Sequence, residues 1–236
     1  MDATGSPTDG ASAGPVLLVD RRDSWALLTL NRPAKRNALS IELRDAVTAA
    51  LGELAADTTV KGVAITGADD IFSAGFDLSE FERAAADPAL AAAIWESSDR
   101  FHHALLSFPL PLVAAVNGKA LAGGFDLAVC CDVRLADTTA SFAHPEFTWS
   151  EVVYVPLEAA VGGAVARDLT LTGRALDAEA AFRVGLVTEL AEPGELAAAL
   201  ETTMTRVASA SRDALLRTKA KAIRRAGVQL KPTLEL

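Results

Sequence analysis

The sequence has 236 residues, of which 50% are hydrophobic and 22% charged, and its formal net charge is −9. A chain this long and apolar buries a core as one domain, so general disorder is excluded. The negative net charge argues against nucleic acid as a main partner, because a protein that binds the negatively charged duplex needs a positively charged surface. No apolar run approaches the ~18 residues of a membrane span. The only cysteines, Cys130 and Cys131, are neighbours, which favours a reducing compartment; we expect a cytoplasmic protein.

The remaining pattern alternates short apolar runs with amphipathic stretches. Residues 1–14 are rich in small and polar types without the features of a signal peptide, and are expected to form a disordered tail. Strands are expected at 16–19, 25–30, 60–66, 71–72, 112–116, 133–136, 140–143 and 185–190. Helices are expected at 41–56 with Ser40 as N-cap, over 76–107 with a break near Pro88, at 125–131, from 158 with a break at 171–173, and twice within 192–227. Such alternation predicts an α/β fold.

Two glycine-containing turns are the first candidates for chemistry. Residues 72–78 follow one predicted strand, and residues 116–127 connect another strand to a helix. Small residues let the backbone approach a ligand closely, and the first N–H groups of a helix lack partners within it. For each turn alone, a tight connection that needs glycine only for its φ angle or packing is the better explanation. Together they predict a pair of N–H donors to one oxygen, an oxyanion hole.

The order of these segments resembles the crotonase family, also called the enoyl-CoA hydratase/isomerase superfamily. The matching segments are 30–33 with 37–40, 72–78, 117–132, 142–146, 172–174 and 180–187. The resemblance implies a spiral of ββα units over 15–190 and a C-terminal helical region over 191–236. In the family that region builds a trimer or a dimer of trimers and helps to cover the pocket. This chain ends at Leu236, earlier than a typical member, so we expect a last covering helix to be missing.

The resemblance also implies a substrate and a set of binding groups. Family members bind acyl-CoA thioesters and stabilise an enolate with two backbone N–H groups, which fall on Phe76 and Gly123. No separate cofactor is implied, because coenzyme A is part of the substrate. The positions implied to line the substrate pocket are Ala38, Ala74, Gly75, Asp77, Leu78 and Gly124.

Two carboxylates complete the implied site. Hydratase relatives hold water with two glutamates, which fall on Glu146 and, one methylene shorter, on Asp126. Paired acids suit hydration, since one group activates water while the other group delivers a proton. From spacing alone, Asp126 is equally a helix-start acid, and Glu146 has the alternative of a solvated loop acid. We expect an enoyl-CoA hydratase; the alternatives are an isomerase with Glu146 as its single base and a non-catalytic acyl-CoA-binding paralogue. A decarboxylase ranks lower.

Three features depart from the family pattern or add to it. Residues 147–158 replace a glycine- and proline-rich loop, and Trp149 and Tyr154 either line the pocket or are core or subunit-contact aromatics. The motif His144-Pro145-Glu146 superficially matches zinc deaminases, but the cysteine spacing is wrong and no metal site is expected. A basic run comprises Arg217, Lys219, Lys221, Arg224 and Arg225. It is either a solvated helix face or, through Lys219 or Lys221, a contact to CoA phosphates.

Overall fold

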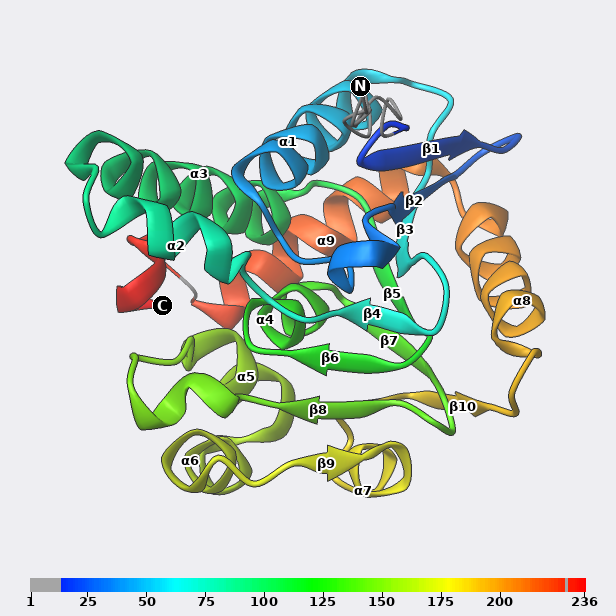
Figure 1. Cartoon of the computed structure of the whole chain (residues 1–236). Helices are drawn as coiled ribbons and strands as arrows, with labels where there is room; N and C mark the ends of the chain where they lie inside the picture. The colour runs from blue at the N-terminus through cyan, green and yellow to red at the C-terminus, as the bar shows by residue number, and fades with distance from the viewer. Residues whose placement is uncertain (1–13, 228) are drawn as a thin grey trace, which may run out of the picture.

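Two β-sheets of different size lie side by side in the computed structural model, which describes residues 14–227 and 229–236 (Figure 1). The expected tail 1–14 lies outside the described residues except for Gly14. The larger sheet has the spatial order β1 (Leu17–Arg21), β2 (Ala26–Leu30), β3 (Val63–Gly67), β5 (Leu112–Val116), β7 (Val133–Asp137) and β10 (Glu189–Ala191). The smaller sheet has the order β4 (Ile71–Ser73), β6 (Lys119–Leu121), β8 (Ser141–Ala143) and β9 (Leu176–Asp177).

From β3 to β8, successive strands alternate between the two sheets, and helices follow each pair. In the pairs β3–β4, β5–β6 and β7–β8, the first strand joins the larger sheet and the second joins the smaller one. The β1–β2 and β8–β9 pairings are antiparallel, and the other pairings in both sheets are parallel. The expected α/β spiral of ββα units is therefore confirmed. Parallel strands need a crossover connection, and the helices between the pairs provide it.

Most helices lie on the outside of the sheets (Figure 1). Helix α4 is the exception: all its residues are buried, and it packs against the smaller sheet on one side and against α3 and α5. The helix bounds are α1 (Ile41–Ala56), α2 (Leu78–Ala84), α3 (Pro88–Ser107), α4 (Gly123–Cys130), α5 (Val155–Val161), α6 (Gly163–Thr172), α7 (Ala178–Arg183), α8 (Leu196–Ser209) and α9 (Arg212–Ala226). Short 3-10 helices are η1 (Pro33–Lys35), η2 (Pro145–Thr148) and η3 (Thr233–Glu235). Ser40 caps α1 as expected, because its side chain accepts a hydrogen bond from the Leu43 amide at 3.3 Å. Within the described residues, no helix is both long and apolar enough to traverse a bilayer.

Some expected elements differ from the structure. The strand expected at 185–190 is shifted: it begins only at Glu189 and ends at Ala191, and α7 precedes it at 178–183. Asp177 starts that helix by accepting a hydrogen bond from the Ala180 amide, and Gly185, with a φ of +79°, follows its end. The helical stretch from 158 is divided at Gly162, which also has a φ of +79°. Strands β6 and β9 were not expected, because runs of three and two residues carry no readable periodicity.

Candidate active site

A cavity of about 470 Å³ opens where β4 ends and α4 begins. Its wall also includes parts of α2, α3, η2 and the C-terminal η3, so it collects residues from most of the length of the chain. The lining residues are Ala74, Phe76, Leu78, Phe81, Trp95, Ala122, Gly123, Asp126, Pro145, Glu146, Trp149, Ser150, Glu151, Val153, Thr233 and Leu234.

The two glycine turns meet at this cavity. The φ angle of Gly75 is +87°, and a Cβ atom there would lie 2.7 Å from Cβ of Ala122 and 3.1 Å from the amide nitrogen of Gly123. Glycine is therefore required at 75 both for its φ and for the close approach. The N–H groups of Phe76 and Gly123 donate to no protein acceptor among the described residues. Two unpaired donors thus belong to residues that border one cavity, as an oxyanion hole requires.

A buried histidine, His144, lies between the carboxylates of Asp126 and Glu146. Asp126 is in the first turn of α4, and Glu146 is in η2. Nδ1 of His144 is 3.0 Å from Oε1 of Glu146, and Nε2 of His144 is 3.8 Å from Oδ1 of Asp126. Each of these three side chains has one buried atom without a hydrogen-bond partner among the described residues: Asp126 Oδ1, His144 Nε2 and Glu146 Oε2. The three side chains therefore form one electrostatically coupled group.

Burial and mutual contact shift the protonation of this group. Burial raises the pKa of Asp126 to about 7; the charge of Glu146 adds to this effect and that of His144 opposes it. Burial also acts to lower the pKa of His144. The hydrogen bond to Glu146 and the charges of both carboxylates outweigh burial, so the pKa of His144 is raised above its ordinary value. Near neutral pH, Asp126 is thus partly protonated, and its protonated form is available as an acid beside Glu146.

Aromatic side chains form part of the cavity wall. The rings of Phe76 and Phe81 stack with centroids 6.1 Å apart, and Trp95 lies edge-on to Phe81 at 5.9 Å. Trp149 lies at the mouth and is 68% exposed. The charged side chains of the lining, Asp126, Glu146 and Glu151, are all acidic. An apolar pocket with convergent acidic groups is suited to a small-molecule ligand whose bound part is uncharged.

The structure brings together the residues expected for the chemistry and only part of those expected for binding. Of the site residues named from the sequence, Ala74, Phe76, Leu78, Gly123, Asp126, Glu146 and Trp149 line the cavity. Gly75 and Gly124 pack behind it, and a Cβ atom on Gly124 would lie 2.5 Å from the Ser73 carbonyl oxygen. Their role in the structure is the close contact of the two turns.

The other expected binding residues have local partners. Asp77 caps α2 through the Ser79 amide and forms an ion pair with Arg32 at 2.8 Å. The Ala38 carbonyl accepts a hydrogen bond from Arg32. The hydroxyl of Tyr154 donates to Glu158 at 3.1 Å, and its ring is not part of the cavity wall.

Several lining residues were not expected from the sequence. Phe81 and Trp95 lie on two successive helices, where an aromatic residue is usually part of the core. Thr233 and Leu234 come from the end of the chain. Thr233 is held there by Asp99, which accepts from its backbone amide at 2.7 Å, and by the Ser98 hydroxyl at 2.8 Å. A contact over such a distance in sequence gives no local signal.

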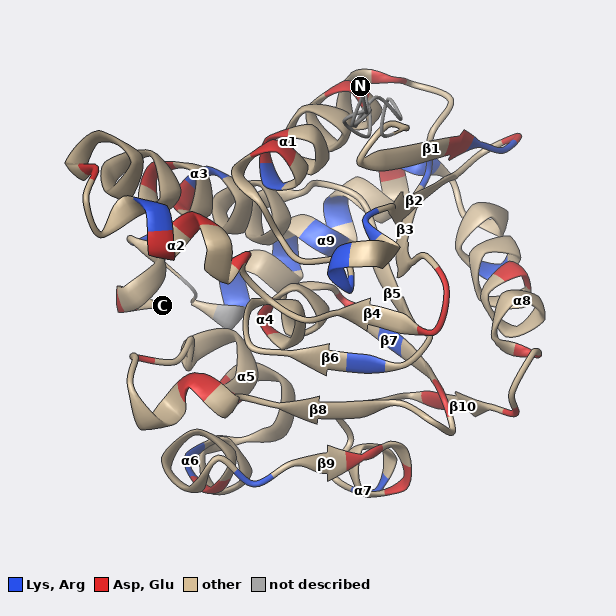
Figure 2. Ribbon diagram, viewed as in Figure 1, with Lys and Arg blue, Asp and Glu red and all other residues tan. Residues whose placement is uncertain are grey.

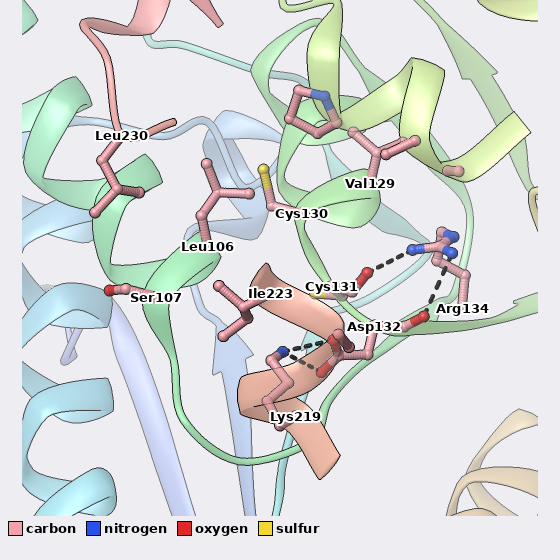
Figure 3. Close-up of a pocket in the computed structure, with 14 residues that line it drawn as sticks. Leu106, Ser107, Val129, Cys130, Cys131, Asp132, Arg134, Lys219, Ile223 and Leu230 are labelled. Carbon is pink, nitrogen blue, oxygen red and sulfur yellow. Dashed lines mark hydrogen bonds and ion pairs between the residues drawn. The ribbon is translucent and has the colours of Figure 1, made fainter. Parts of the chain in front are cut away.

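A second cavity, of about 250 Å³, lies at the C-terminal end of α4 (Figure 3). Lys219, which is 8% exposed, projects into it from α9 and binds both carboxylate oxygens of Asp132. This ion pair argues against a contact of Lys219 with CoA phosphates, because its charge is already paired within the protein. Figure 2 shows the basic run along α9, in which Lys221 is exposed.

Comparisons with known proteins agree with this geometry. A family model described as enoyl-CoA hydratase/isomerase matches residues 20–235. The chain is 38% identical to 2,3-dehydroadipyl-CoA hydratase of Escherichia coli over 178 residues, which cover 74% of this chain and 68% of that protein. It is 35% identical to crotonyl-CoA hydratase of Syntrophomonas wolfei over 190 residues, covering 76% of this chain and 70% of that protein.

Solved structures give the same result. An enoyl-CoA hydratase/isomerase from Xanthobacter autotrophicus Py2 superposes with a TM-score of 0.84 at 29% identity, covering 90% of this chain and 80% of that one. A monofunctional enoyl CoA isomerase from M. smegmatis superposes with a TM-score of 0.77 at 30% identity, covering 91% of this chain and 95% of that one.

Proposed function

Since this chain belongs to the enoyl-CoA hydratase/isomerase family, we propose that it adds water to the double bond of a 2-enoyl-CoA thioester. One observation carries this proposal: the residues with two unpaired amides, Phe76 and Gly123, border the same cavity as the carboxylates of Asp126 and Glu146. Hydration needs both parts, because the amides stabilise the negative charge on the thioester oxygen while the carboxylates move protons.

The proposed steps follow from the state of each group. The thioester oxygen accepts hydrogen bonds from the amides of Phe76 and Gly123. Glu146 accepts a proton from water through its unpartnered Oε2 as the water oxygen bonds to the β-carbon. The π electrons move to the thioester oxygen, which gives the enolate. Asp126, whose pKa is raised to about 7, delivers its proton to the α-carbon.

The pocket also supports a class of acyl group. Its wall is aromatic, with Phe76, Phe81 and Trp95 in contact, and all its charged lining side chains are acidic. A terminal carboxylate on the acyl chain would be repelled and would lose hydration without gaining a cation. We therefore expect neutral acyl groups to be preferred over those that end in a carboxylate.

Isomerisation is the second candidate. Asp126 is one methylene shorter than the glutamate implied by the family resemblance, and moving a double bond needs only one base. The similarity to the isomerase from M. smegmatis supports the same alternative. In this reaction Glu146 removes a proton from the α-carbon and returns it to the γ-carbon, so that Asp126 is not required for proton transfer.

A panel of thioesters separates these activities. Wild type, Glu146→Gln and Asp126→Asn are assayed with 2-enoyl-, 3-enoyl- and malonyl-CoA. We expect hydration of the 2-enoyl substrate, lost by more than about a hundredfold in both variants. Isomerisation lost only in Glu146→Gln would support the second candidate. CoA-thioester binding without turnover would contradict both and indicate the non-catalytic paralogue.

Two further properties are proposed from the family. We propose that no cofactor is required beyond the coenzyme A of the substrate, which activity after exhaustive dialysis tests. We also propose a homotrimer or a dimer of trimers; exposed apolar side chains such as Leu171 (73%) and Phe182 (48%) support association. Light scattering coupled to gel filtration measures the mass directly.

A further inference from the structure

The chain holds two buried histidines in opposite electrostatic surroundings. His102 on α3 is 0% exposed; Nδ1 lies 2.9 Å from the Ser98 carbonyl, and burial lowers its pKa to about 4. His144 is 1% exposed, yet its pKa is raised rather than lowered. Burial is common to both, so the contacts of His144 with carboxylates account for the difference.

Two carboxylates and one aromatic ring surround the imidazole of His144. Asp126 faces it from α4 at 3.8 Å, and Glu146 faces it from η2 at 3.0 Å. The ring of Phe125 covers it with centroids 4.7 Å apart. Glu151 also borders the cavity but is exposed, so solvent screens its charge. The charges that act on the imidazole are therefore those of Asp126 and Glu146.

We propose that His144 is a positioning residue for the reaction: an imidazolium that donates from Nδ1 to Oε1 of Glu146 and faces Asp126 with Nε2, and so holds two carboxylates in one buried cavity. This inference rests on the proposed function for its catalytic meaning. The hydrogen bond occupies one oxygen of Glu146 and leaves Oε2, which has no partner, to accept a proton. The hydrogen on Nε2 faces the unpartnered Oδ1 of Asp126.

An imidazolium between Asp126 and Glu146 reduces the electrostatic repulsion between the two carboxylates. Two carboxylates close together in a buried site repel each other, so one of them retains a proton. The imidazolium opposes this effect, since its charge lowers the pKa of Asp126. Protons then leave the three groups in steps that belong to the unit rather than to one residue.

The proton on His144 is measured directly by NMR of the histidine rings, without any substrate. We expect His144 to become protonated at a pH above the ordinary value of ~6.5. Glu146→Gln and Asp126→Asn should each lower that pH, while His102 stays neutral down to about pH 5 as an internal control. His144 titrating below ~6.5, or unchanged in both variants, would overturn the proposal. This readout does not need turnover, so it remains decisive if the hydratase assay fails.

The second measurement is the pH dependence of kcat/KM in His144→Gln, which keeps a donor but has no charge. Loss of the imidazolium raises the pKa of Asp126, which must be protonated to deliver its proton, so the basic limb of the profile should move to higher pH. We expect a loss of roughly tenfold or more at pH 6.5 that shrinks to about threefold or less at pH 9. An equal loss at every pH would indicate a merely structural role and contradict the proposal. If His144→Gln does not fold, the NMR comparison in the carboxylate variants still decides.

A divalent cation is the competing explanation for this cluster. The ligand-type atoms of Asp126, His144 and Glu146 lie within 4.8 Å of one another. The hydrogen bond that already occupies Nδ1 of His144 favours a shared proton. Wild type is therefore assayed before and after dialysis against EDTA. We expect unchanged activity; a loss that added Zn²⁺ restores would overturn the proposal.

Discussion

The aromatic ring of Phe76 lies directly against the backbone of Gly123. A Cβ atom on Gly123 would approach Cδ1 of Phe76 to 2.7 Å and Cε1 to 2.8 Å, which is closer than real Cβ contacts. The two proposed oxyanion donors are thus joined by a van der Waals contact between their residues. The absence of a side chain at 123 fixes how near the two donors lie.

Substitution of Gly123 by alanine tests this contact. In Gly123→Ala the new methyl group pushes the Phe76 ring and separates the donors, so we expect kcat to fall by about 10²-fold, as for loss of one oxyanion donor. Steady-state kinetics with a 2-enoyl-CoA measures the change. Gly52→Ala is the matched control, because a Cβ atom there meets nothing within 4 Å. Its activity should be that of wild type, and an equal loss in both variants would contradict the explanation.

The protonation of Asp126 predicts how stability depends on pH. Its pKa is raised from 3.8 to about 7, so the folded state binds the proton more tightly than the unfolded state. The native state therefore becomes less favourable as pH rises from about 4 to above 7, by at most ~1.4 kcal/mol per pKa unit. Asp126→Asn removes this cost. Urea denaturation should show a larger gain in the free energy of unfolding at pH 8 than at pH 5.

The control for that experiment is an aspartate with the opposite shift. The pKa of Asp57 is lowered by its hydrogen bonds to Thr59, so this group is ionised in both states between pH 5 and 8. Asp57→Asn should change the free energy of unfolding by the same amount at both pH values. A pH-independent effect of Asp126→Asn as well would show that burial does not hold its proton.

The ion pair between Lys219 and Asp132 predicts a structural role on α9. Lys219→Ala leaves Asp132, whose side chain is 32% exposed, without its cation, and we expect a loss of roughly 1–3 kcal/mol in stability. CoA affinity should be unchanged. Lys221→Ala, at an exposed position, should alter stability by less than about 0.5 kcal/mol. Thermal unfolding and titration with CoA measure both effects; weaker CoA binding in Lys219→Ala would contradict this assignment.

The two cysteines should be unreactive in the folded protein. Both are buried with free thiols, and burial raises the pKa of Cys130 well above its ordinary value and that of Cys131 to about 12. Because the thiolate is the reactive form, labelling by Ellman's reagent at pH 8 should be slow. Both thiols should react within the mixing time in denaturant. Rapid labelling of the native protein would show that the C-terminal end of α4 opens.

Local signals predicted much of the fold. Ser40 and the apolar spacing that follows it indicated α1, and the run at 112–116 indicated β5, with the same bounds as in the structure. Gly162 was harder to interpret, because its positive φ separates two helices within one Ala-rich stretch. A glycine in such a stretch has no local mark that distinguishes a break from a tolerated interruption.

The site was predictable where backbone turns form it and unpredictable where distant segments meet. The two turns around Gly75 and Gly123 were recognisable as a pair, since each follows a strand. The bridging position of His144 depends on η2 packing against α4, which no local pattern reveals. The contribution of Thr233 to the wall likewise depends on contacts of η3 with α3.

The packing of η3 against α3 affects how the protein can be tagged for purification. Leu236 is 4% exposed, and its carbonyl accepts a hydrogen bond from the Val155 amide. An affinity tag fused after Leu236 would begin at a buried residue, only a few residues from Thr233 and Leu234 in the cavity wall. We therefore expect a purification handle after Leu236 to disturb the part of the cavity wall that Thr233 and Leu234 form. Kinetic work should therefore use a handle at the other end, or one that is cleaved before measurement.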